Sequence, residues 1–237
     1  MPFWDHLEEL RWRIFKVISA VLIGSIISYI LWEDLLELLI QPTKNLSIDL
    51  HIQVLSVTSM FIIKISCSIL CGIMLSIPLI FYQFWRFIAP AFKSGNRITM
   101  ISVTIFATIF FIIGIWFGFF IMIPFSLGFF TSMTTTALDV NYNFTLENYL
   151  YYILWLTMIS GMIFQLPVVS YYFTRIGILT PAFLRYYRKF AFLAFLIIGA
   201  ILTPPDPISQ IMVVIPLMLL YELSIVIAII FGEKIIA

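Results

Sequence analysis

The first thirteen residues hold the side chains best suited to recognising a charged ligand. Glu9 and Arg13 are four residues apart with the acid first, which predicts a surface ion pair on one helix face, contributing about 0.3 kcal/mol. A sharper hypothesis is that Glu9 offers its carboxylate to an incoming cationic peptide, because carboxylates pair bidentately with guanidinium groups. Charged faces are usually only solvated, so the pattern leaves both interpretations open.

Gln165 is a polar side chain inside an apolar segment. It lies about ten residues, or roughly 15 Å, before Arg175, and therefore near the middle of a bilayer. One interpretation is an interhelical hydrogen bond, or capture of the carbonyl freed by a kink at Pro167. The other is a polar spot in a groove that receives another protein's transmembrane helix.

Glu222 lies about nine residues before Phe231 and would be costly if it faced lipid. It is predicted either to have a buried structural partner, such as a tyrosine or Lys64, or to serve a function inside the membrane. Lys64 itself could simply extend its ammonium group to the membrane surface.

Catalytic and metal chemistry find little support. Cys67 and Cys71 are one helical turn apart, side by side rather than in disulfide geometry, which favours packing. His6 and His51 are too few and too far apart for a metal site. The apolar segments contain no histidine, and no aspartate apart from Asp206, so an intramembrane protease is the weakest hypothesis. We predict no catalytic residue, no metal and no cofactor.

The elements that position these residues must lie in lipid. Of 237 residues 62% are hydrophobic and 11% charged, too much apolar surface for one soluble core of this length. The formal net charge of +1 gives no reason to expect a nucleic-acid partner.

Six apolar segments predict an all-α integral membrane protein that forms a single membrane domain over residues 1–237. An amphipathic helix over 1–13 runs without a break into the first span. The fifth span has about 14 residues, roughly 20 Å against a hydrocarbon core of roughly 30 Å, so it is short. The spans are expected near residues 14–32, 59–82, 98–123, 149–173, 189–203 and 208–231.

Basic residues give the orientation. Arginine and lysine collect in the loops on one side, whereas the loop 131–148 has none and Lys44 stands alone on the far side. Both termini are therefore predicted to be cytoplasmic. The segment 33–40 predicts a helix on the far membrane surface that stops at Pro42. Gly114 and Gly118 lie on one face and favour close helix packing within this chain over dimerisation.

Several motifs together resemble the TatC family, the multispanning receptor subunit of the twin-arginine, Sec-independent protein translocase. The opening stretch with His6, Leu7, Glu9, Leu10, Arg11 and Arg13 is similar to the family's N-terminal signature. The run 82–85 with Phe87 and Pro90 resembles its first cytoplasmic loop, and Thr203 to Asp206 resembles its last hairpin. The likeness covers essentially the whole chain and implies a concave bundle of six helices with short fifth and sixth spans.

The resemblance implies that the N-terminal helix and first cytoplasmic loop bind twin-arginine signal peptides of folded proteins. It implies single-span partners of the TatA and TatB type near the fifth span, several copies of this chain in the complex, and transport driven by the proton-motive force in a bacterial inner membrane or an organelle membrane of bacterial descent. The signal-peptide site would comprise His6, Leu7, Glu9, Leu10, Arg11, Phe87, Pro90 and Asn96, and the intramembrane partner site Gln165, Thr203, Asp206 and Glu222.

Two positions depart from the family's pattern. The family usually has an acidic residue in place of Asn96, so Glu9 would carry more of the guanidinium site. It often has glutamate in place of Gln165, and an amide retains hydrogen bonding but neither charge nor titration. The alternative function is a small-solute transporter or channel, with Gln165, Lys64 and Glu222 along its path.

Overall fold

The chain is almost entirely helical in a computed structural model that describes residues 3–44, 51–56, 58–88, 97–132, 143–175, 177–202 and 207–232. It forms two compact units. The first contains residues 1–109 and 137–155, and the second contains residues 110–136 and 156–237. Two of the helices, α4 and α6, contribute residues to both units.

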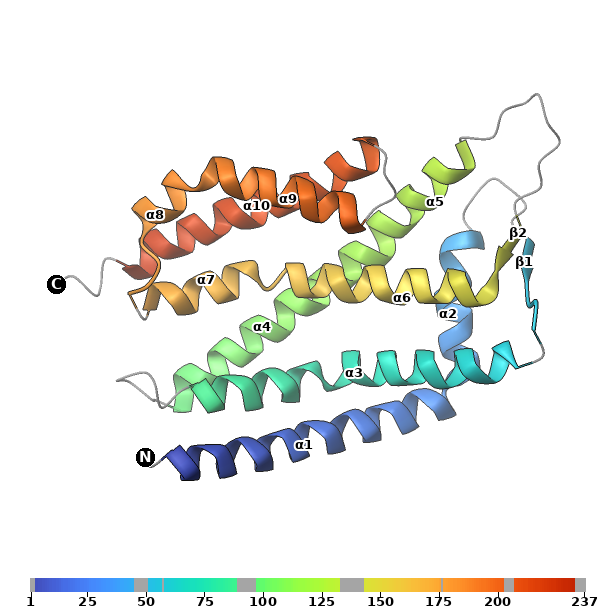
Figure 1. The fold of residues 1–237 in the computed structure, drawn as a ribbon, viewed down its shortest axis with the longest axis horizontal. Helices are drawn as coiled ribbons and strands as arrows, with labels where there is room; N and C mark the ends of the chain where they lie inside the picture. The colour runs from blue at the N-terminus through green and yellow to red at the C-terminus, as the bar shows by residue number, and fades with distance from the viewer. Residues whose placement is uncertain are drawn as a thin grey trace. The chain divides into compact units, whose positions relative to one another are not determined.

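Two long helices, α1 (Phe3–Ile30) and α3 (Ser59–Ile88), lie side by side in the first unit (Figure 1). Small residues bring them together, because a Cβ on Gly72 would lie only 2.3 Å from Ser25 Oγ and one on Gly24 only 2.7 Å from the carbonyl oxygen of Gly72. Interhelical contact in membranes depends on such close backbone approach. The N-terminal turns of α1 are thereby held against the last turns of α3.

At the other end of this unit, α2 (Trp32–Lys44) and the start of α6 (Leu146–Ile163) meet the start of α3. Tyr149 donates its hydroxyl to the carbonyl of Leu39 at 3.0 Å, and Ser59 donates to Glu147 at 3.2 Å. Strands β1 (His51–Gln53) and β2 (Asn143–Thr145) pair in parallel.

Helix α2 continues to Lys44, so the predicted stop at Pro42 is wrong. A proline removes a single N–H donor, and in the last turn the carbonyls lack helical partners in any case. Thr43 donates its hydroxyl to the carbonyl of Ile40 at 2.7 Å, a further contact in the last turn.

In the second unit, α4 (Arg97–Phe117) continues through a π-helical turn, η2 (Gly118–Met122), into α5 (Ile123–Ser132). A Cβ on Gly114 would lie 2.7 Å from the carbonyl oxygen of Ser160, and one on Gly118 would lie 2.9 Å from Ser160 Cβ. These glycines therefore pack against α6, which confirms the predicted packing within this chain.

After α7 (Leu166–Arg175), the chain forms α8 (Pro181–Tyr186), α9 (Arg188–Leu202) and α10 (Pro207–Gly232). Thr180 caps α8 by accepting from the Phe183 N–H at 3.2 Å, with Pro181 in the first turn. Leu184 is buried against Ile225 and Ala228 of α10.

The predicted all-α membrane architecture is confirmed. Among the described residues, five stretches are long and apolar enough to cross a bilayer: Trp4–Ile30, Ser59–Phe87, Ile101–Phe129, Leu146–Arg175 and Gln210–Phe231. Helix α9 has 15 residues and is therefore about 22 Å long, short of the roughly 30 Å hydrocarbon core. Helix α10 has 26 residues, or about 39 Å, so the expectation of a short sixth span is wrong.

Candidate functional site

An ion pair lies at the N-terminal end of α1. Arg13 donates from both Nε and Nη2 to one carboxylate oxygen of Glu9, Oε1, with the Nε distance at 3.1 Å. Arg13 also donates from Nη1 to the side-chain oxygen of Gln83 on α3 at 3.3 Å. The Arg13 side chain is only 10% exposed, whereas that of Glu9 is 28% exposed, so the arginine is part of the helix interface and the carboxylate faces outward.

An aromatic pair flanks this carboxylate. The rings of His6 and Phe87 stack with centroids 4.3 Å apart and planes 11° from parallel. His6 Nδ1 lies 3.8 Å from Glu9 Oε2, the oxygen that Arg13 does not use. Three predicted site residues, from α1 and α3, are thus brought together.

The ionisation of Glu9 follows from these contacts. The hydrogen bonds from Arg13 lower the pKa of Glu9 below its ordinary value, and the positive charges of Arg13, His6 and Arg86 act in the same direction. Partial burial opposes this shift. The outcome is a carboxylate that stays charged and can hold a cation.

The other predicted members of this site divide into two groups. Leu7 is 41% exposed and Leu10 half-buried, so both add apolar surface at this end of α1. Arg11 is exposed and pairs with Glu8 at 3.4 Å instead of Glu9. Pro90 and Asn96 lie outside the described residues.

Gln83 is the member of the site that sequence reasoning missed. It is 8% exposed and fixes Arg13 from the neighbouring helix. Its spacing offered a signal, because Gln83 precedes Phe87 by four residues and so lies on the same helix face.

Gln165 lies at a break between α6 and α7. Its N–H donates to the carbonyl of Met162 at 3.0 Å, and its carbonyl accepts from Val169 at 2.9 Å. Pro167 explains the break, because it has no N–H for the carbonyl of Ile163. The half-buried Gln165 side chain is therefore at a discontinuity of the span.

Glu222 forms a bidentate ion pair with Arg188, the first residue of α9. Nε and Nη2 of Arg188 lie 2.8 Å from Oε1 and Oε2 of Glu222, respectively. The partner is therefore an arginine, and neither a tyrosine nor Lys64, whose ammonium lies 4.2 Å from the ring centroid of Tyr29. Thr203 and Asp206 lie outside the described residues.

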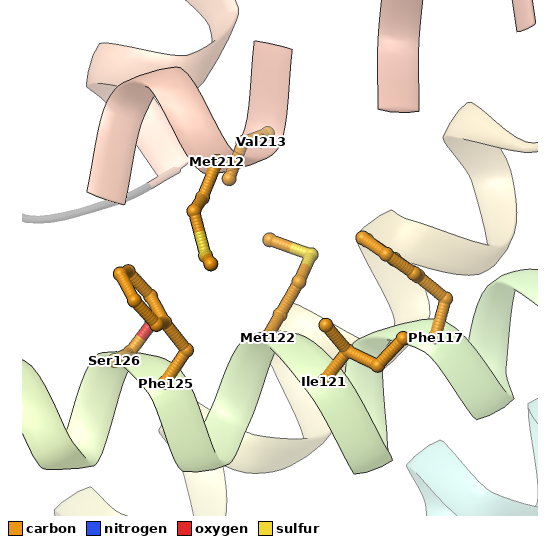
Figure 2. A pocket seen from close by; sticks show the side chains of 7 residues that line it. All are labelled: Phe117, Ile121, Met122, Phe125, Ser126, Met212 and Val213. Atoms are coloured by element: carbon orange, nitrogen blue, oxygen red, sulfur yellow. The ribbon is translucent and has the colours of Figure 1, made fainter. Parts of the chain in front are cut away.

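A hollow in the second unit lies between α10 and the succession of α4, η2 and α5. Met122 and Met212 extend toward each other across it (Figure 2). Its lining is apolar apart from one hydroxyl, and offers little to bind a polar solute: Phe117, Ile121, Met122, Phe125, Ser126, Met212 and Val213.

Comparisons with known proteins agree with one another. Residues 5–216 match the model of the family described as "Sec-independent protein translocase protein (TatC)". The chain is 35% identical over 225 residues to TatC of Aquifex aeolicus, covering 95% of this chain and 93% of the relative. It is 32% identical over 228 residues to TatCy of Bacillus subtilis, covering 96% and 89%.

A solved structure shares the fold. The crystal structure of a "Twin Arginine Translocase Receptor- TatC" superposes with a TM-score of 0.82 and 34% identity, covering 95% of this chain and 98% of that chain.

Proposed function

Because the chain belongs to the TatC family of Sec-independent protein translocase proteins, a family of multi-pass proteins of the bacterial inner membrane, we propose that it is the receptor for twin-arginine signal peptides. The recognition site in this proposal is the end of α1 with the last turns of α3. Its members are His6, Leu7, Glu9, Leu10, Arg11, Phe87, Pro90 and Asn96.

The observation that carries the proposal is that Arg13 bonds only one of the two oxygens of the Glu9 carboxylate. Arg13 occupies Oε1, and Oε2 accepts no hydrogen bond from the described residues. An arriving guanidinium can therefore bind Oε2 without displacing Arg13. Charge-assisted hydrogen bonds of this kind each contribute about 1.5–3 kcal/mol.

The stacked His6 and Phe87 rings offer a second contact. A guanidinium is planar and stacks on aromatic faces, so a second arginine beside the first has a surface next to Glu9. Exposed Leu7 and half-buried Leu10 provide apolar contact for the hydrophobic region that follows the charged part of a secretory signal.

The proposal extends to partners and energy source. Single-span proteins of the TatA and TatB type would dock inside the membrane at Gln165, Thr203, Asp206 and Glu222, with several copies of this chain in the complex and the proton-motive force driving transport. Support comes from family membership and from the polar character of these residues within apolar spans. The sequence has no Gly-Lys-Ser/Thr loop for ATP phosphates.

The alternative of a solute path gains no support from the same residues. Lys64 contacts Tyr29, and Glu222 contacts Arg188, so both charged side chains have a local partner.

Deleting the gene tests the proposal. A folded reporter carrying a signal with two arginines should then stay in the cytoplasm, and the plasmid-borne chain should restore export. The same reporter with two lysines serves as the control for signal recognition. Export that persists without the chain would contradict the receptor role.

A further inference from the structure

The junction between α8 and α9 carries more positive charge than the chain itself neutralises. Three basic residues lie within five positions: Arg185, Arg188 and Lys189. Glu222 neutralises Arg188. The Arg185 side chain has no ion pair or hydrogen bond with the described residues, and the Lys189 side chain has only a ring contact, with Nζ 5.3 Å from the centroid of Phe190.

Arg185 and Lys189 are four residues apart and both exposed. The chain bends between them at Tyr187, the residue that separates α8 from α9. Near this bend the carbonyl of Leu184 accepts a hydrogen bond from the Tyr221 hydroxyl at 2.8 Å. Both side chains are cations, and an anion bound to both removes their mutual repulsion. The electrostatics therefore favour a negatively charged occupant.

An apolar stripe continues from this basic pair along α9. Its members follow at intervals of four, three and four residues, which places them along one side of the helix. They are 69%, 52%, 55% and 56% exposed, respectively: Tyr186, Phe190, Leu193 and Ile197. A chain of hydrocarbon fits such a stripe, and tyrosine at its head is typical of the membrane interface.

We propose that Arg185 and Lys189 bind the phosphate of an anionic phospholipid whose acyl chain lies along Phe190, Leu193 and Ile197. The two unneutralised cations match a lipid with net negative charge better than a zwitterionic one, whose own ammonium group competes for its phosphate. The apolar stripe distinguishes a lipid from free phosphate, because free phosphate has no apolar part to contact the stripe.

The test is lipid binding to the purified full chain in detergent, measured by native mass spectrometry with phosphatidylglycerol and phosphatidylcholine. Each basic residue near a membrane surface contributes about a fivefold gain in affinity for anionic lipid. Exchanging both residues, R185Q with K189Q, should therefore weaken phosphatidylglycerol binding about thirtyfold and leave phosphatidylcholine binding unchanged.

Two controls keep the outcome interpretable. The charge-conserving pair R185K with K189R should retain binding, which separates charge from folding. K16Q removes a single exposed cation from α1 and should weaken phosphatidylglycerol binding about fivefold at most, well short of the effect of the double variant. Equal phosphatidylglycerol binding by wild type and R185Q with K189Q, or an equal loss in K16Q, would overturn the proposal.

Competition identifies the source of the anion. Inorganic phosphate at millimolar concentration should not displace phosphatidylglycerol, because it lacks the acyl chain. An acidic peptide that displaces the lipid at equal concentration would overturn the lipid assignment and indicate a protein segment as the occupant.

Discussion

Arg13 places two donors on Oε1 of Glu9, and Oε2 faces His6 at 3.8 Å. The ion pair that the sequence predicts as ordinary surface chemistry is therefore asymmetric. Its arginine is nearly buried and bonded to Gln83, whereas its carboxylate is partly exposed. The ion pair can stabilise the contact of α1 with α3 and still leave Oε2 of Glu9 able to accept a hydrogen bond from a ligand.

Removing the arginine should loosen this contact. R13A leaves the buried Gln83 side chain without its partner, which costs about 1–3 kcal/mol. Thermal unfolding in detergent should show a lower Tm. R11A, which removes an exposed arginine two residues earlier, should change stability by at most about 0.5 kcal/mol. Equal Tm values for the two variants would contradict the role given to Arg13.

The ring stack should matter for binding rather than for folding. F87L removes the aromatic face and should weaken binding of a twin-arginine peptide about threefold, since cation–π contacts at exposed sites contribute about 0.5–1 kcal/mol. Fluorescence anisotropy of a labelled peptide measures the change. F84L is the matched control, because Phe84 lies on the same helix and packs edge-on against Trp85. A loss of equal size in F84L would refute a specific contact at Phe87.

Because α1 and α3 approach closely at Gly72, replacing this glycine with alanine should affect stability more than the same change at Gly128, which has open space around it. G72A introduces a Cβ 2.4 Å from the backbone nitrogen of Ser25 and should destabilise the protein by about 1–3 kcal/mol. G128A meets nothing within 4 Å and should be neutral or slightly stabilising. Comparing their denaturation midpoints checks this contact, and a tolerated G72A would show that the helices are farther apart.

Exchanging the charges of the Arg188–Glu222 ion pair tests whether function depends on the ion pair itself or on which residue stands at each position. R188E places two carboxylates in contact and should reduce export of a twin-arginine reporter, whereas R188E with E222R should restore part of it. No restoration in the exchanged variant would argue against the ion pair as the functional unit.

The lowered pKa of Glu9 gives a prediction for pH. The ionised form is favoured in the folded state, so its contribution is present above the ordinary pKa of 4.5 and is lost as pH falls through the lowered value. The contribution of Glu9 to peptide binding, measured by anisotropy as the difference in affinity between wild type and E9Q, should therefore be constant between about pH 5 and 8. A decline centred near pH 6 would show that Glu9 does not supply the charge.

Composition and charge distribution are enough to predict the membrane fold, because about twenty consecutive apolar residues have few other uses. The contact of His6 with Phe87 joins residues 81 positions apart and cannot be derived from spacing within one helix. The motif resemblance places both residues in one site but does not predict that their rings stack. The sequence places Arg188 at the start of the fifth span, and spacing within one helix cannot pair it with Glu222, 34 positions away.

The proposed receptor role depends above all on the Glu9 carboxylate binding an arginine of the arriving signal peptide. Its most direct test is the Kd of a labelled twin-arginine peptide for purified wild type, E9Q and E8Q, each compared with a twin-lysine peptide. We expect E9Q to weaken binding of the twin-arginine peptide about tenfold or more and to remove the preference for it over the twin-lysine peptide. E8Q should bind both peptides as wild type does. Unchanged preference in E9Q would contradict this role of Glu9.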